Sequence, residues 1–102
     1  MAASGNSEEL RAVRVSIEGR VHGVGYRAWT ERTALALGLR GWVRNRRDGS
    51  VEAVFAGSTA CIDEMVRLCH QGPRSAAVQS VTVVEEVHDD AVGFAVLPTA
   101  CT

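Results

Sequence analysis

The sequence predicts a single α+β domain in the order β-α-β-β-α-β, with an antiparallel sheet, two helices on one face and a short fifth strand. Three observations lead to this prediction. The chain has 102 residues, which suffices for one hydrophobic core. Alternating apolar and polar residues indicate strands, and a 3.6-residue apolar repeat indicates a helix between them. Finally, Asp48-Gly49 stands between two strand-like segments, which is a strong hairpin signal.

The first half of the domain is predicted as a strand, a glycine-rich loop and a helix. Residues 13–17 alternate between apolar and polar side chains, as expected for a half-buried strand. Three glycines within residues 19–25 interrupt this pattern. Good helix formers then run from residue 27 or 28 to Leu37, and Gly38 is suited to end the helix.

The second half predicts two strands, a helix and a final long strand. Residues 40–45 and 51–55 form the strands that flank the Asp-Gly turn. Ser58 or Thr59 caps the helix that follows. Its core stripe recurs at i, i+3, i+4 and i+7, in Ile62, Met65, Val66 and Cys69. Valine-rich residues 78–87 predict a fourth strand, and Phe94 with Val96 a short fifth one. This order is that of a ferredoxin-like βαββαβ sandwich.

The predicted topology brings the glycine-rich loop and the hairpin to one edge of the sheet. A right-handed crossover makes the first two strands parallel, so both end at that edge. The first helix begins there and directs its unpaired N–H groups and positive dipole end toward it. Glycines let a backbone expose successive N–H groups, and arginine binds two phosphate oxygens at once. Residues 19–27 therefore predict a phosphate or carboxylate cradle.

Composition limits the classes of function. The net charge is −1, from 11 basic and 12 acidic residues, which gives no electrostatic case for a nucleic acid or an anionic membrane as partner. Every basic residue is arginine, so a Walker A phosphate loop and a lysine nucleophile are excluded. The three cysteines contain no Cys-x-x-Cys pair, and His70 and His88 lack metal-ligand spacing. We therefore expect no metal and no cofactor.

The predicted domain occupies residues 11–98, between a flexible leader at residues 1–10 and a C-terminal tail at residues 99–102. The leader is polar where a signal peptide would be apolar, and no run approaches the roughly 20 apolar residues that span a bilayer. We expect a soluble cytoplasmic monomer that acts on a small molecule.

Two segments resemble the signatures of the acylphosphatase family. Residues 19–27 match Gly-x-Val-Gln-Gly-Val-Gly-aromatic-Arg, with His22 in place of the usual glutamine. Residues 41–45 match Gly-Trp-Val-x-Asn, and an Asp-Gly turn and Val-Glu follow at residues 48–52. The resemblance covers about residues 13–96, although the final strand lacks the arginine that is frequent in the family.

This resemblance implies hydrolysis of a small acyl phosphate to a carboxylate and inorganic phosphate, without a metal or a covalent intermediate. It implies that Arg27 binds the phosphoryl group and that Asn45 orients the attacking water. It assigns phosphate binding to the backbone of Val21, His22, Gly23, Val24, Gly25, Tyr26 and Arg27.

Other interpretations stay open. A non-catalytic domain that binds anions or acyl phosphates would use the same cradle. An RNA-recognition module shares the element order but needs stacking aromatics on its central strands, where Phe55 stands alone. The His22 side chain is either peripheral or titrates near a bound phosphate. Four arginines near the edge are interpreted as exposed charges: Arg20, Arg44, Arg46 and Arg47. Three aromatic residues are expected to pack in the fold: Tyr26, Trp29 and Trp42.

Overall fold

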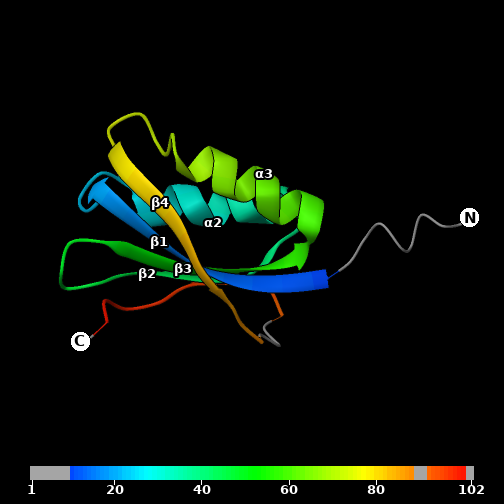
Figure 1. Cartoon of the computed structure of the whole chain (residues 1–102). Helices are drawn as coiled ribbons and strands as arrows, with labels where there is room; N and C mark the ends of the chain where they lie inside the picture. Colours follow the sequence, from blue (N-terminus) through cyan, green and yellow to red (C-terminus); the bar gives the residue numbers. More distant parts are fainter. Residues whose placement is uncertain (1–9, 89–91, 101–102) are drawn as a thin grey trace, which may run out of the picture.

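The predicted order of elements is confirmed in the computed structural model, which describes residues 10–88 and 92–100. The elements are β1 (Leu10–Arg20), α2 (Tyr26–Ala36), β2 (Arg40–Asn45), β3 (Val51–Ser58), α3 (Thr59–Cys69), β4 (Ala77–Glu86) and β5 (Phe94–Val96) (Figure 1). The predicted leader lies outside the described residues apart from Leu10, where β1 begins, and so do the last two residues of the predicted tail.

The strands form one sheet in the order β4-β1-β3-β2-β5. The pairs β1–β3, β1–β4 and β2–β3 are antiparallel, as predicted, but β5 runs parallel to β2. The sheet is therefore mixed, because the chain leaves β4 at one edge and returns at the other, alongside β2. Contact with β2 continues beyond β5, since the N–H of Leu97 donates to the Val43 carbonyl and that of Ala100 to the Asn45 carbonyl, both at 2.9 Å.

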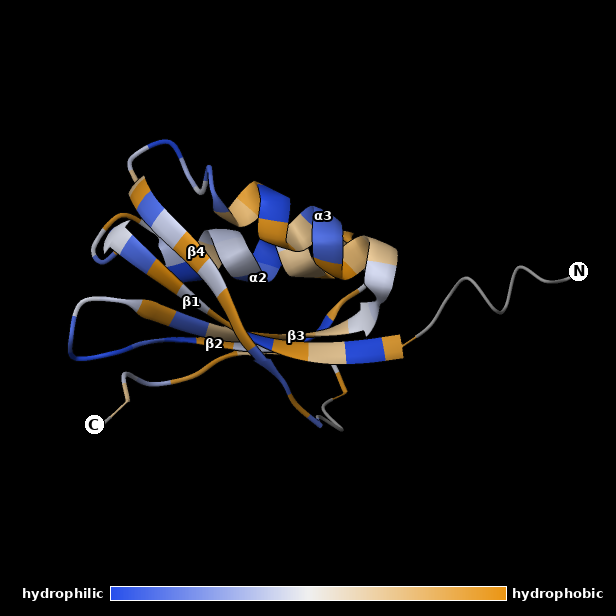
Figure 2. Cartoon of the chain, viewed as in Figure 1, coloured by the Kyte–Doolittle hydropathy of each residue, from blue (hydrophilic) through white to orange (hydrophobic). Residues whose placement is uncertain are grey.

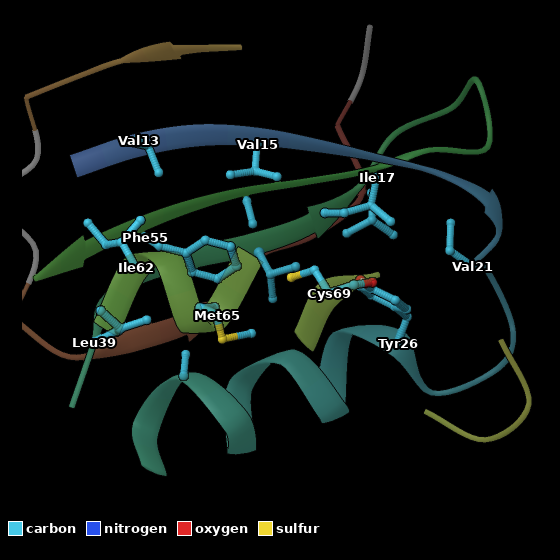
Figure 3. Close-up of a cluster of buried hydrophobic side chains, with 14 residues drawn as sticks. Val13, Val15, Ile17, Val21, Tyr26, Leu39, Phe55, Ile62, Met65 and Cys69 are labelled. Carbon is cyan, nitrogen blue, oxygen red and sulfur yellow. The ribbon is translucent and has the colours of Figure 1, made fainter. Parts of the chain in front are cut away.

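Both helices cover the same face of the sheet, and the core lies between the two layers (Figures 1 and 3). The alternation along β1 is visible as bands of opposite hydropathy in Figure 2, and its apolar residues Val13, Val15 and Ile17 are fully buried. From α3, the buried residues are Ile62, Met65 and Cys69, which confirms the predicted stripe.

The helix α2 buries a stripe that the sequence pattern does not reveal. Its buried residues are Tyr26, Thr30 and Ala34, each four positions apart. The Thr30 hydroxyl donates to the Tyr26 carbonyl at 2.8 Å, and the Tyr26 hydroxyl donates to the Cys69 carbonyl at 2.7 Å. These internal bonds let polar atoms enter the core without an unsatisfied group. Tyr26 is therefore a packing residue, as expected, and it fixes the first turn of α2 against α3.

Candidate active site

The loop between β1 and α2 is shaped by two glycines with left-handed backbone conformations. Gly23 has φ +70° and Gly25 has φ +81°. A Cβ atom added at either residue would meet no other atom within 4 Å, so space does not demand glycine here. The positive φ does, because residues with a Cβ rarely adopt it. These two turns bring the chain from the end of β1 into the start of α2.

The N-terminus of α2 is left without a side-chain cap. Gly25 is its N-cap residue, and the first turn contains no acidic residue. The first backbone bond runs from the N–H of Trp29 to the Gly25 carbonyl, at 3.0 Å. The N–H groups that precede Trp29 in the helix consequently have no acceptor within it. Together with the positive end of the helix dipole, they form a favourable environment for an anion.

A cavity of about 310 Å³ opens at this helix start. Its walls come from the loop, from α2, from the end of β2 and from β5: Val21, Gly23, Gly25, Tyr26, Arg27, Ala28, Glu31, Asn45 and Val96. The predicted pair Arg27 and Asn45 thus lines a single cavity, although 18 positions separate them in the chain. Within the described residues the Arg27 guanidinium makes no ion pair, so its charge is available to a ligand.

Asn45, which lines this cavity, carries a buried acceptor without a partner among the described residues. It is the last residue of β2 and is 8% exposed. Its main-chain carbonyl is bonded to the N–H of Ala100, but its side-chain Oδ1 is buried and has no hydrogen-bond partner within residues 10–88 and 92–100. A buried polar atom without a partner typically costs about 1–3 kcal/mol. A donor that reaches this oxygen, such as a water molecule, would remove this cost.

Two predicted phosphate-binding positions do not line the cavity. Val24 packs against the hydrophobic core. The imidazole of His22 lies against the hairpin between β2 and β3, with its Nε2 atom 2.8 Å from the Ser50 carbonyl oxygen. The remaining predicted positions, Val21, Gly23, Gly25, Tyr26 and Arg27, do contribute to the lining.

Three lining residues were missed by the sequence reasoning: Ala28, Glu31 and Val96. Glu31 lies four positions after Arg27, a spacing that places two residues on the same face of a helix. That signal was available in the sequence. Val96 had no comparable signal, because it reaches the cavity through the parallel pairing of β5 with β2.

The hairpin that follows Asn45 is held by a compact set of hydrogen bonds. The Asp48 carboxylate accepts from the N–H of Ser50 at 2.9 Å and from its hydroxyl at 2.6 Å. These bonds, the hydroxyl's foremost, lower the pKa of Asp48 below its ordinary value. The N–H of Arg46 donates to the Ser50 carbonyl at 2.9 Å. The position of Ser50 is therefore fixed relative to Asn45.

The interpretation of Arg44 and Arg46 as exposed charges is wrong. On the face of the sheet opposite the helices, both contact the buried carboxylate of Glu52, Arg44 at 2.8 Å and Arg46 at 3.5 Å. Arg14 from β1 completes the group at 3.2 Å. Glu52 is 4% exposed, so its charge requires these partners. This cluster is a structural element of the sheet.

Within residues 10–88 and 92–100, no group of three or more His, Cys, Asp or Glu side chains is arranged to hold a metal ion. In the same part of the chain, no helix has the length and apolar character needed to cross a membrane.

Comparison with known proteins gives a consistent result. Residues 13–96 match the acylphosphatase family. An acylphosphatase from Bradyrhizobium diazoefficiens is 55% identical over 93 residues, which cover 85% of this chain and 94% of that protein. One from Rhodopseudomonas palustris is 60% identical over 75 residues, 74% of each chain. The solved structure of an acylphosphatase from Coxiella burnetii superposes with a TM-score of 0.83 at 32% identity, covering 95% of this chain and all of that one.

Proposed function

Because this chain belongs to the acylphosphatase family and is a hydrolase of that class, we propose that it cleaves small acyl phosphates by direct attack of water on phosphorus. Arg27 and the backbone of residues 21–27 hold the phosphoryl group, and Asn45 holds the water. One observation carries the proposal: Arg27 and Asn45 line the same cavity, and among the described residues neither the Arg27 guanidinium has an ion-pair partner nor Asn45 Oδ1 a hydrogen-bond partner.

The phosphoryl group is bound by charge that the fold leaves unneutralised. The planar guanidinium of Arg27 donates two parallel N–H bonds to phosphate oxygens, which is a geometry that matches the tetrahedral anion. The open N–H groups of the first turn of α2 supply further donors and the positive end of a dipole. These preorganised donors stabilise the negative charge that spreads over the phosphoryl oxygens in the transition state.

The water is held on the side of the cavity formed by the end of β2. Asn45 Oδ1 accepts one hydrogen of the water, which turns an oxygen lone pair toward phosphorus. A bond forms between the water oxygen and phosphorus while the bond to the acyl oxygen breaks, and its electron pair leaves with the carboxylate. The proton of the water passes to a phosphate oxygen. A carboxylate is a good leaving group, so positioning is the main requirement.

A monomer stays a prediction from the sequence, and the mechanism as proposed uses neither a metal nor a cofactor. A cytoplasmic location stays a prediction from the sequence. Both relatives described above are acylphosphatases, and this chain matches them over most of their length. This favours an enzyme over the alternative of a non-catalytic binding domain.

Hydrolysis of an acyl phosphate in water enriched in oxygen-18 tests where the water attacks. We expect one labelled oxygen in the inorganic phosphate and none in the carboxylate. An enzyme-free sample, incubated until the same fraction has hydrolysed, corrects for spontaneous cleavage. Label in the carboxylate would show attack at the carbonyl carbon and would contradict the proposal.

A further inference from the structure

We propose that His22 is a positioning residue, which sets the distance between the phosphate loop and the water held by Asn45. This inference rests on the proposed function of the two sites. His22 lies in the loop, yet its imidazole reaches across to the hairpin, where Nε2 lies 2.8 Å from the Ser50 carbonyl oxygen. The ends of β1 and of the β2–β3 hairpin lie on the same side of the molecule (Figure 1).

The direction of this hydrogen bond follows from the acceptor. A carbonyl oxygen has no proton to give, so Nε2 of His22 must carry the hydrogen. The neutral ring then has its free lone pair on Nδ1. Protonation of Nδ1 leaves the Nε2–H donor in place. This hydrogen bond to the hairpin therefore does not depend on the charge of the ring, and it is a third role beside the two that the sequence leaves open.

The acceptor belongs to Ser50, a residue that several hydrogen bonds hold in the hairpin. The Ser50 carbonyl also accepts from the N–H of Arg46, the residue next to Asn45, at 2.9 Å. Asp48 fixes the other polar groups of Ser50 at 2.9 and 2.6 Å. Directly after Ser50, Val51 pairs in register with Asn45. The imidazole is thus bonded to a residue that hydrogen bonds and strand pairing connect to Asn45.

The other end of the connection is the phosphate loop itself. His22 precedes Gly23, which lines the cavity and has a left-handed conformation. The loop and the hairpin come from separate parts of the chain, and the His22–Ser50 bond links them beside the cavity. In-line attack depends on the position of the water relative to phosphorus, and a displacement of about 1 Å can cost on the order of 10² in rate. Loosening this bond should therefore slow turnover more than it weakens phosphate binding.

Substitution of His22 separates the donor from the shape of the side chain. His22→Phe keeps a ring and removes the donor. We expect kcat to fall by roughly tenfold, since the loop loses one of several restraints, while the inhibition constant of inorganic phosphate changes by less than about twofold. His22→Gln supplies an amide donor and should retain most of the activity. His22→Met matches glutamine in length but has no donor. Its kcat should also fall by roughly tenfold. This variant provides the test if His22→Phe folds poorly.

A double-mutant cycle with Asn45→Ala tests whether His22 acts through the water site. In the Asn45→Ala background, His22→Met should lower kcat by less than about twofold, because there is no positioned water to misplace. A full tenfold loss in that background would overturn the inference while leaving the role of Asn45 intact. Unchanged kcat in folded His22→Met would overturn it as well. If Asn45→Ala alone leaves kcat unchanged, the proposed water site fails first and the role of His22 fails with it.

Discussion

The two helices have the same length of 11 residues but begin in opposite ways. At α3, the Ser58 hydroxyl caps the helix by accepting the N–H of Cys61 at 3.2 Å. At α2, the corresponding residue is Gly25, which has no side chain to offer. The N–H groups of α3 are thus used to stabilise the fold, whereas those of α2 remain open beside a cavity. At α2, a bound anion can therefore accept the N–H groups that a side-chain cap would otherwise accept.

The arginines show the same contrast. Arg44 donates to buried Glu52 at 2.8 Å, and its guanidinium lies 5.0 Å from the centre of the Trp42 ring. Arg27 makes no ion pair with any described residue. The residue type is identical, and the partner decides its role. Arg44 helps to hold the open face of the sheet, and Arg27, which lines the cavity, is available to bind phosphate.

The largest effect is expected from Arg27. Both Arg27→Ala and Arg27→Lys should lower kcat/KM by on the order of 10³ while the protein remains folded, because a lysine point charge cannot replace the two-pronged contact. The exposed Arg32, on the same helix, provides the control, and Arg32→Lys should retain full activity. Near-normal kcat/KM in Arg27→Lys would contradict the role of Arg27 in binding phosphate.

Glu52→Gln should lower the stability of the protein but leave its activity unchanged. Loss of the buried charge leaves Arg14, Arg44 and Arg46 without their shared partner, so the free energy of unfolding should fall by roughly 1–3 kcal/mol. Glu64→Gln is the matched control, since it breaks an exposed pair with Arg67 and should cost about 0.5 kcal/mol or less. Denaturant unfolding measures both. Equal losses in the two variants would contradict the structural role of the cluster.

Ser58→Ala removes the cap of α3 and should cost about 1 kcal/mol of stability. Turnover should stay unchanged, because the capped N-terminus has no part in the cavity. Thermal unfolding and a steady-state assay on the same sample check both statements. A loss of turnover comparable to that of Arg27→Ala would show that the two helix N-termini are not functionally distinct.

The smallest effect concerns Asp48 and appears at acidic pH. Its lowered pKa means that the unfolded chain binds the proton more tightly, so the carboxylate stabilises the fold above its ordinary pKa of about 3.9. This contribution should be lost as the pH falls from about 5 through the lowered pKa. Asp48→Asn keeps an acceptor for Ser50 but does not titrate. Its melting temperature should decline less in this range than that of the unsubstituted protein, and parallel declines would contradict the assignment.

Much of this fold follows from local patterns in the sequence. The alternation at residues 13–17 and the stripe of α3 predict their elements because burial there is periodic and apolar. The stripe of α2 escapes such a pattern, since Thr30 is buried by donating its hydroxyl to the Tyr26 carbonyl. The parallel β5 also escapes it, because its place depends on long-range pairing with β2.

The same division applies to the site. The glycine-rich loop, Arg27 and Asn45 were assigned from motifs and topology, and they line one cavity. The His22–Ser50 bond and the Glu52 cluster depend on side chains that cross from one element to another. No spacing in the sequence predicts such contacts. The residues of the cavity are therefore more predictable from sequence motifs and topology than the contacts that restrain them.

The central claim is that phosphate binding and water positioning are carried by separate residues, and Asn45→Ala tests it most directly. Turnover and inhibition by inorganic phosphate are measured on the same folded preparation. We expect kcat to fall by on the order of 10² or more, while the inhibition constant of phosphate changes by less than about threefold. Asn45→Asp should recover nothing, because its charge repels the phosphoryl group. Equal losses of turnover and phosphate affinity, or a loss in neither, would contradict the account.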